Sequence, residues 1–137
     1  MPRFIFLEHV GAPDDPVGRH VDLLLEDGDS CRTWRLASIP AADGDAVEAT
    51  PIAPHRLAWL DHVDGPVSGN RGHARRIAAG TYMGLDRVVD TGREKDPRAT
   101  SDAVQVRLAG EGLMSGTLTI TAGQAWLELE PSGFSSP

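Results

Sequence analysis

The chain has 137 residues, the length of one ordinary domain, and 40% of them are hydrophobic, which is sufficient for a single core. A formal net charge of -7 and a pI near 5.1 argue against a protein that coats nucleic acid through a basic surface, so any nucleic-acid contact must be local. The one cysteine, Cys31, excludes an intramolecular disulfide and a multi-cysteine zinc site, which fits a reducing compartment. No apolar run has the length of a signal peptide or a membrane span, so we expect a cytoplasmic protein without membrane contact.

The first half of the chain predicts β-strands. Fifteen glycines and ten prolines divide the sequence into short segments, in which apolar residues mostly recur at period two. We expect a first strand at residues 3–9 and a second at 19–26. In the second strand His20 and Asp22 share one face, because side chains two residues apart in a strand point the same way. A glycine turn at 27–29 then predicts a hairpin with the next apolar run.

The remaining elements follow the same pattern. We expect them, in chain order, at 31–37 (strand), 46–52 (possible strand), 55–62 (one or two helical turns), 104–108, 117–121 and 124–130 (strands). The polar stretch 91–102 predicts an exposed, mobile loop, and 131–137 a loose tail. About seven or eight strands in a single domain spanning 1–137 predict a small, closed or partly closed antiparallel β-barrel with one short helical segment, because an open sheet would leave long unpaired edges.

A histidine and an aspartate in the second strand suggest a metal site. The apolar neighbours of His20 and Asp22 imply a strand that is largely buried on both faces, and an unpartnered buried carboxylate is costly. A metal ion, an arginine or a backbone donor would each satisfy Asp22, and the nearby histidine favours the metal. His9 ends the first strand and could meet His20 at the mouth of a hairpin, with Asp14 and Asp15 as alternative oxygen ligands. Chance spacing of exposed polar residues is the alternative explanation.

A glycine-rich and arginine-rich stretch at 65–76 is a candidate anion site. Three glycines there would let the backbone approach a ligand, and arginine binds phosphate through two parallel hydrogen bonds. The candidate phosphate-binding residues are Arg71, Arg75 and Arg76. The alternative is a loop followed by a strand whose arginines are solvated, and the spacing matches neither a P-loop nor a dinucleotide fingerprint.

The other histidines are less informative. His55 follows a proline and precedes an apolar run, so it is either a helix-start residue or a site residue held by a rigid entry. His62 and His73 have no partner at short range in the sequence, and we expect both at the surface.

The order of these motifs resembles that of the 3′-phosphoesterase domain at the N-terminus of bacterial DNA ligase D and its stand-alone relatives. That family has a histidine, a His-Tyr/Trp-Asp-Phe/Leu-x-Leu-Glu segment, a Trp-centred strand, a His-Pro-Leu-x-Tyr segment and a Gly-rich stretch ending in Gly-Thr-Tyr/Trp. The corresponding segments here are His9, HVDLLLE at 20–26, RTWRLA around Trp34, HRLAW at 55–59, and GPVSGNRG leading to GTY at 80–82. The match covers roughly residues 3 to 130 in consistent order, and the ordered set is far more specific than any one motif.

The resemblance implies a small β-barrel with a divalent metal, often manganese, in a polar interior crevice. It implies that His9, His20 and Asp22 bind the metal and that His55 acts at the scissile phosphate. Family members remove a terminal phosphate or ribonucleotide from DNA or RNA 3′ ends before ligation. The resemblance thus implies a metal-dependent phosphoesterase of end repair, with a nucleic-acid 3′ end or another phosphoester as ligand and a repair ligase or polymerase as a possible partner. A His₂Asp set is also compatible with zinc or iron.

Two residues depart from the family pattern. Leu24 stands where the family has a phosphate-contacting arginine, and Trp59 replaces a tyrosine whose hydroxyl could act on phosphate. The loop between His9 and His20 is also longer than in the ligase domains. Either one of the three arginines in 65–76 replaces the missing one, or the protein binds phosphate, a nucleic-acid end or a repair partner without efficient turnover. A third interpretation is a barrel for an unrelated small ligand, with structural histidines.

Overall fold

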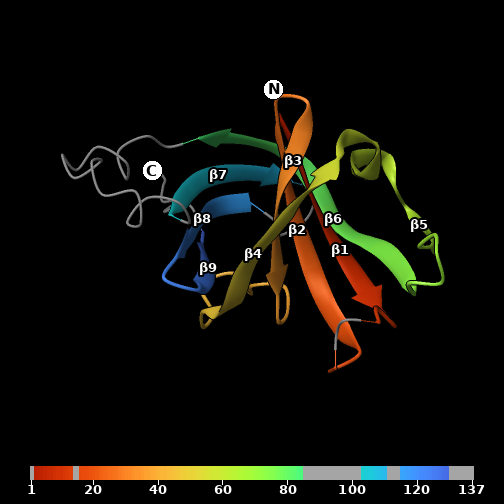
Figure 1. Cartoon of the computed structure of the whole chain (residues 1–137). Coiled ribbons are helices and arrows are strands. Elements are labelled where there is room, and N and C mark those ends of the chain that lie inside the picture. Colours follow the sequence, from red (N-terminus) through yellow and green to blue (C-terminus); the bar gives the residue numbers. More distant parts are fainter. Residues whose placement is uncertain (1, 14–15, 85–102, 111–114, 130–137) are drawn as a thin grey trace, which may run out of the picture.

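The computed structural model describes residues 2–13, 16–84, 103–110 and 115–129, which form strands and one 3-10 turn (Figure 1). In chain order the elements are β1 (Arg3–Val10), β2 (Arg19–Asp27), β3 (Ser30–Leu36), β4 (Val47–Arg56), the 3-10 turn η1 (Leu57–Asp61), β5 (Asp64–Pro66), β6 (His73–Gly84), β7 (Val104–Gly110), β8 (Ser115–Thr121) and β9 (Gln124–Glu128). The predicted loop at 91–102 and the predicted tail at 131–137 lie outside the described residues.

The strands form a closed antiparallel β-barrel. Their hydrogen-bonded order is β1-β2-β3-β4-β9-β8-β7-β6, and pairing of β6 with β1 closes the circle of eight. The short strand β5 pairs with the first residues of β6 and lies outside this circle. The prediction of a mainly β barrel with one short helical segment is confirmed, and closure gives each of the eight barrel strands a partner on both sides over at least part of its length.

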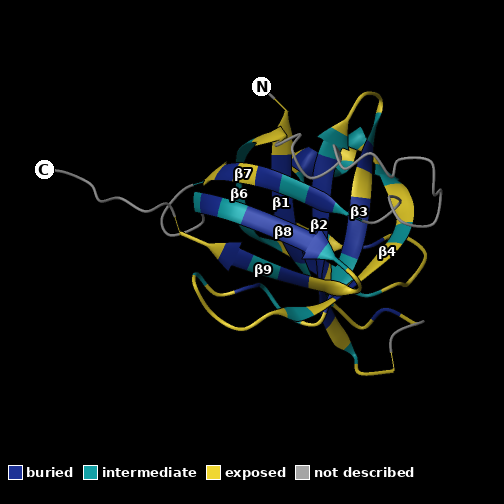
Figure 2. Ribbon diagram, turned by 90° about the vertical axis from the view of Figure 1, so that its left-hand side faces the viewer, coloured by how far each residue is buried: buried dark blue, intermediate teal, exposed yellow. Residues whose placement is uncertain are grey.

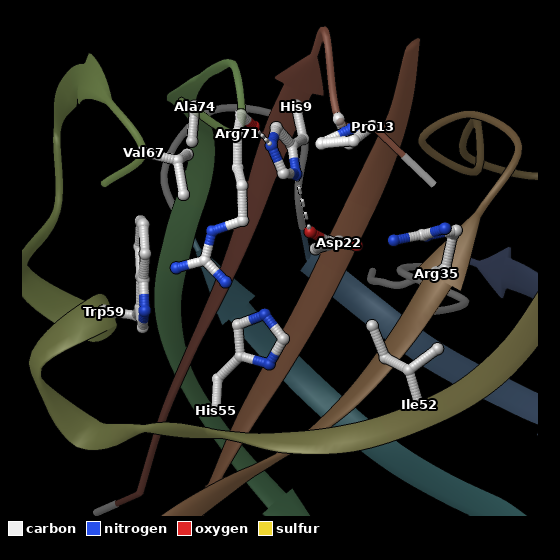
Figure 3. Close-up of a pocket in the computed structure, with 11 residues that line it drawn as sticks. His9, Pro13, Asp22, Arg35, Ile52, His55, Trp59, Val67, Arg71 and Ala74 are labelled. Atoms are coloured by element: carbon white, nitrogen blue, oxygen red, sulfur yellow. Dashed lines mark hydrogen bonds and ion pairs between the residues drawn. The ribbon is translucent and has the colours of Figure 1, made fainter. Parts of the chain in front are cut away.

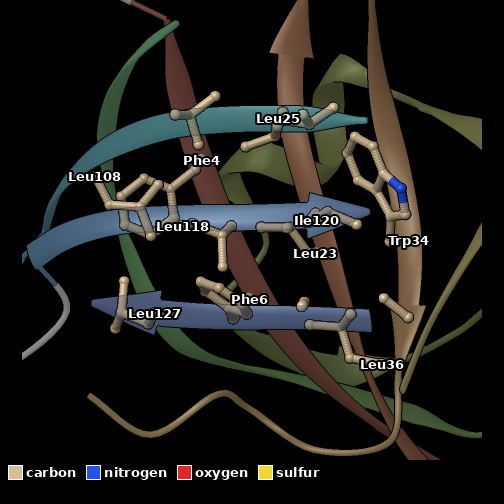
Figure 4. Close-up of a cluster of buried hydrophobic side chains, with 14 of the residues drawn as sticks. Phe4, Phe6, Leu23, Leu25, Trp34, Leu36, Leu108, Leu118, Ile120 and Leu127 are labelled. Carbon is tan, nitrogen blue, oxygen red and sulfur yellow. The ribbon is translucent and has the colours of Figure 1, made fainter. Parts of the chain in front are cut away.

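The barrel interior is a continuous apolar core (Figure 4). It is built by alternate residues of every barrel strand, because successive side chains of a strand point to opposite faces. Its fully buried large side chains include Phe4, Phe6, Leu23, Trp34, Leu36, Leu108, Leu118 and Ile120. The complementary residues of β1 and β2 therefore point away from this core.

A second, smaller apolar cluster lies on the outer face of β1 and β2. Ile5, Leu7 and Leu24 are buried there against Leu60 of η1. Strands β1 and β2 are consequently buried on both faces over most of their length, as the apolar neighbours of His20 indicate. This outer layer is the part of the fold that carries the candidate site.

An arm made of the second half of β4, η1 and β5 covers that outer face. Strand β4 pairs with β9 only at Val47 and Glu48, whereas its later residues pair with β3 alone and are mostly exposed (Figures 1 and 2). The possible strand at 46–52 thus extends further than predicted, and His55 belongs to it rather than to a helix. In the part of the chain that the structure describes, no helix is long and apolar enough to cross a membrane.

Candidate metal and anion site

His9, His20 and Asp22 converge at one end of the β1–β2 hairpin. In the strand register His9 lies opposite His20, and Asp22 follows on the same face of β2. One ligand atom from each of the three residues lies within 4.8 Å of the other two. The predicted metal-ligand set is therefore brought together by two adjacent strands.

The chemistry of this cluster fits a divalent cation. The Oδ2 atom of Asp22 is 3.7 Å from His9 Nδ1, and its Oδ1 atom is 3.2 Å from His20 Nε2. Ligand atoms that each lie about 2.1 Å from one metal ion are roughly 3.0–3.5 Å apart when the angle between them is near 90–110°. The Asp22 side chain is only 6% exposed, and none of the described groups donates a hydrogen bond to its buried Oδ1. A bound cation would satisfy this carboxylate oxygen.

A hydrogen bond outside the cluster orients His9. The Nε2 atom of His9 lies 2.8 Å from the main-chain oxygen of Arg71, which can only accept, so Nε2 carries the proton. In the neutral ring this leaves Nδ1, which faces Asp22, as the nitrogen with a free lone pair. Metal-binding histidines are commonly held in this way, with the second ring nitrogen donating to a carbonyl oxygen.

The location of the cluster corrects one expectation. The resemblance implied a crevice in the barrel interior, but His20 and Asp22 alternate with Val21 and Leu23, which are the residues of β2 that fill the interior. The cluster therefore lies on the outer face of the barrel wall, beneath the arm that contains β4 and η1. Burial there comes from the arm rather than from the barrel core.

A pocket of about 350 Å³ opens beside the cluster (Figure 3). His9 and Asp22 lie on one side of it, and His55 and Trp59 come from the arm on the other. His55 Nδ1 lies 3.2 Å from the main-chain oxygen of Ala53, so Nδ1 donates and Nε2 is left to exchange a proton with a ligand. The predicted site histidine thus shares a pocket with two of the predicted metal ligands, His9 and Asp22.

Of the three predicted phosphate-binding arginines, only Arg71 lines this pocket. Its guanidinium extends from the loop before β6 toward His55 (Figure 3). Arg75 points elsewhere and donates to Glu8 Oε1 at 2.7 Å, and Arg76 donates to the main-chain oxygen of His62 at 3.2 Å. The stretch 65–76 therefore consists of β5, a loop and the start of β6, with one arginine at the site.

A second arginine at the pocket, Arg35, was missed from the sequence. It lies on β3 directly opposite Asp22 and faces the same pocket (Figure 3). The position of Arg35 could have been inferred from the hairpin turn. Asp27 pairs with Ser30, and continuing this antiparallel register along both strands places Arg35 opposite Asp22. Strand β3 thus places a cationic side chain at the pocket beside Asp22.

The two departures from the family pattern have clear structural settings. Leu24 is fully buried in the outer apolar cluster, so its side chain faces no ligand. Trp59 forms part of the pocket wall, with its ring centroid 6.3 Å from that of His55 and 4.7 Å from that of the partly buried His62. His73 is exposed and pairs with Asp64, as expected for a surface residue. Asp14 and Asp15 lie outside the described residues.

Hydrogen bonds to Glu8, on the face of β1 opposite His9, hold this strand in place beside the site. Glu8, the neighbour of His9, accepts hydrogen bonds from Arg75 of β6 and Arg19 of β2. The hydrogen bond from Arg75 has the larger effect and that from Arg19 the smaller, and together they lower the pKa of the Glu8 carboxyl below its ordinary value. Glu8 thereby links the three strands at the point where His9 reaches the pocket.

Neither a protein-family model nor a curated protein matches this chain. The pocket has the buried carboxylate of Asp22 and the imidazole of His9 on one side, with His20 adjacent to both, and two guanidiniums and the imidazole of His55 around the rest. Such an arrangement can hold a divalent cation and an oxyanion next to each other.

Proposed function

We propose that this protein is a metal-dependent phosphoesterase that trims the 3′ ends of DNA or RNA. The observation that carries the proposal is that His9 and Asp22, two members of the cluster that His20 completes, line one pocket together with His55 and Arg71. A phosphoester held there would have the cation site on one side and a proton-exchanging imidazole on the other. The motif order that resembles the 3′-phosphoesterase domain supports the same reaction class.

Each residue has a distinct part in the proposed reaction. His9, His20 and Asp22 would hold the cation, for which we propose manganese, with zinc as the alternative. A divalent ion in such a site polarises a phosphoryl oxygen and lowers the pKa of bound water. Arg71 binds the phosphate oxygens, and His55 exchanges a proton through Nε2 while the Ala53 carbonyl holds its Nδ1.

The pocket suits a chain end better than the middle of a duplex. Its volume of about 350 Å³ is at the small end of the range for ligand sites. The acidic net charge disfavours broad contact with the nucleic-acid backbone, whereas the guanidiniums provide local positive charge. Removal of a 3′-phosphate leaves a 3′-hydroxyl, the group that ligases and polymerases need, so we propose such a repair enzyme as the partner and the cytoplasm as the location.

Leu24 supports a second candidate function. Because this leucine is buried in an apolar cluster where the family has an arginine, the site has fewer phosphate contacts than the family pattern. A protein with this pocket could bind a phosphorylated end without efficient turnover. It would then protect or present the end to a partner.

The two functions can be separated with a 5′-labelled primer that carries a 3′-phosphate. The purified protein is incubated with MnCl₂, and release of phosphate is followed on a gel. The phosphoesterase proposal predicts conversion by the wild type and by His73→Ala, and loss of product with His20→Ala and with His55→Ala. Absence of product above the His20→Ala level, with tight binding of the primer, would instead support the binding function. Equal affinity for circular DNA without ends would contradict the end-binding function.

A further inference from the structure

Arg71 contacts the candidate site in two ways. Its main-chain oxygen accepts the hydrogen bond from His9 Nε2 at 2.8 Å, and its side chain lines the pocket beside His55. One residue therefore contacts His9 through its backbone and extends its guanidinium into the pocket toward His55 (Figure 3).

The loop that carries Arg71 is a closed unit. The amide of Val67 donates to the oxygen of Gly72 at 2.8 Å, and the amide of Arg71 donates back to the oxygen of Val67 at 3.4 Å. The Arg71 side chain is held by the same loop, because its Nε atom donates to the main-chain oxygen of Ser68 at 2.8 Å. The carbonyl and the guanidinium of Arg71 are thus positioned by one set of contacts.

The loop is seated directly against the end of β1. Gly72 has a φ of 93°, and a Cβ atom at this position would lie 2.0 Å from the oxygen of Val10. Only glycine permits this close approach of two backbones. The contact is one residue away from His9, so the position of the loop and the position of the metal ligand are mechanically linked.

We propose that Arg71 is a positioning residue for His9 through its main chain and the anion-binding residue through its side chain, so that cation and oxyanion affinities are coupled. A cation held by His9 would withdraw electron density from the imidazole and so strengthen the hydrogen bond that Nε2 donates to the Arg71 carbonyl. That stronger bond holds the loop, and the loop holds the guanidinium. Because binding free energies are reciprocal, a bound oxyanion must strengthen cation binding by the same factor. The inference rests on the metal site of the proposed function but requires no turnover.

Calorimetric titration of Mn²⁺, with and without sulfate, tests the coupling; sulfate serves as the oxyanion probe because its manganese salt is soluble. In the wild type, sulfate tightens Mn²⁺ binding roughly 5-fold or more, within the usual range of such coupling. Arg71→Ala keeps the carbonyl, so its affinity for Mn²⁺ alone stays within about 2-fold of wild type, whereas the sulfate effect is lost. Arg107→Ala, a variant at an exposed arginine of β7 outside the pocket, behaves as wild type.

Displacing the loop is expected to weaken Mn²⁺ binding in the absence of sulfate, which Arg71→Ala does not do. Gly72→Ala leaves all three ligands intact, yet it weakens Mn²⁺ binding alone by about 10-fold or more, the usual effect of losing a hydrogen bond behind a metal ligand. Should Gly72→Ala fail to fold, hydrogen exchange of residues 67–72 in the wild type replaces it. Saturating Mn²⁺ slows that exchange, and His9→Ala abolishes the slowing.

The results that would overturn the coupling differ from those that would overturn the proposed metal site. Mn²⁺ binding that depends on His20 and Asp22, with a sulfate effect that survives in Arg71→Ala, overturns the coupling alone. Unchanged exchange in 67–72 on Mn²⁺ saturation also overturns the coupling alone. Absence of Mn²⁺ binding to the wild type overturns both the coupling and the metal site.

Discussion

His9 and His20 face each other across the β1–β2 pair, with ring centroids 4.9 Å apart and ring planes at 66°. This cross-strand relationship brings two imidazoles together on a rigid hairpin, and Asp22 completes the cluster from the same face. Sites on strands are held more firmly than sites on loops. The candidate metal site is therefore formed by the barrel wall itself, with the covering arm adding His55.

Asp22→Asn should separate metal binding from folding. The amide has the shape of the carboxylate but no charge, so we expect Mn²⁺ affinity to fall by at least about 30-fold while the free energy of unfolding without metal changes by less than about 1 kcal/mol. Urea unfolding with EDTA and with excess Mn²⁺ measures both quantities. The wild type should gain about 2.7 kcal/mol at a metal concentration near 100 times Kd. An equal gain in Asp22→Asn would contradict the ligand assignment.

An arginine at position 24, where the 3′-phosphoesterase motif has one, should destabilise the protein. Leu24 is fully buried between Ile5, Leu7 and Leu60, so Leu24→Arg places an unpaired charge in an apolar cluster and should cost more than about 3 kcal/mol of stability. Leu24→Met keeps the volume and should cost less than about 1.5 kcal/mol. Denaturant unfolding compares the two variants. A stable Leu24→Arg protein with increased phosphate release would show that the strand presents this side chain to the ligand instead.

Arg35→Met should affect the cation and the anion in opposite directions. The guanidinium lies opposite Asp22, so removing its charge should leave Mn²⁺ affinity unchanged or slightly higher, because a nearby positive charge is lost. Affinity for sulfate in the Mn²⁺-loaded protein should fall by about 10-fold, the effect of one charge-assisted hydrogen bond. Arg32→Met, an exposed arginine of the same strand, provides the control. A parallel loss of both affinities in Arg35→Met would indicate a role in folding only.

Glu8→Gln should destabilise the protein in a pH-dependent way. The pKa of Glu8 is lowered by Arg75 and Arg19, so its charge stabilises the folded state above the unfolded pKa, and this contribution is lost as the pH falls through the folded pKa. The two arginines are more than half exposed, which limits the effect to a decrease of roughly 1–4 °C in Tm at pH 7. Thermal unfolding from pH 7 to pH 3 should show the two proteins converging. A difference that stays constant across this range would contradict the ion-pair explanation.

The fold could be predicted from the sequence to the extent that alternation of apolar residues determines it. Residues 19–26 alternate because one face fills the barrel, and the turn at Gly28 fixes the hairpin with β3. The sequence indicates strand β6 only weakly, as the alternative to an anion-binding stretch at 65–76. The residues of β6 are small or only partly buried and do not alternate clearly between apolar and polar. Strand β5 is three residues long and carries no pattern.

The candidate site was predictable where residues lie on neighbouring strands. His9, His20 and Asp22 meet because their strands pair directly, which sequence spacing can indicate. The choice of Arg71 over Arg75 and Arg76 could not be made, because it depends on the loop that turns back onto β1. The outer location of the cluster depends likewise on the arm that covers it.

The most direct test of the account is calorimetric titration of the metal-free protein with Mn²⁺, comparing the wild type with His20→Ala and His73→Ala. His20 is buried beside Asp22, whereas His73 is an exposed histidine outside the pocket. We predict one Mn²⁺ bound per chain by the wild type and by His73→Ala, and a loss of at least about 30-fold in affinity for His20→Ala. Equal affinities for the wild type and His20→Ala would contradict the metal site and the function built on it.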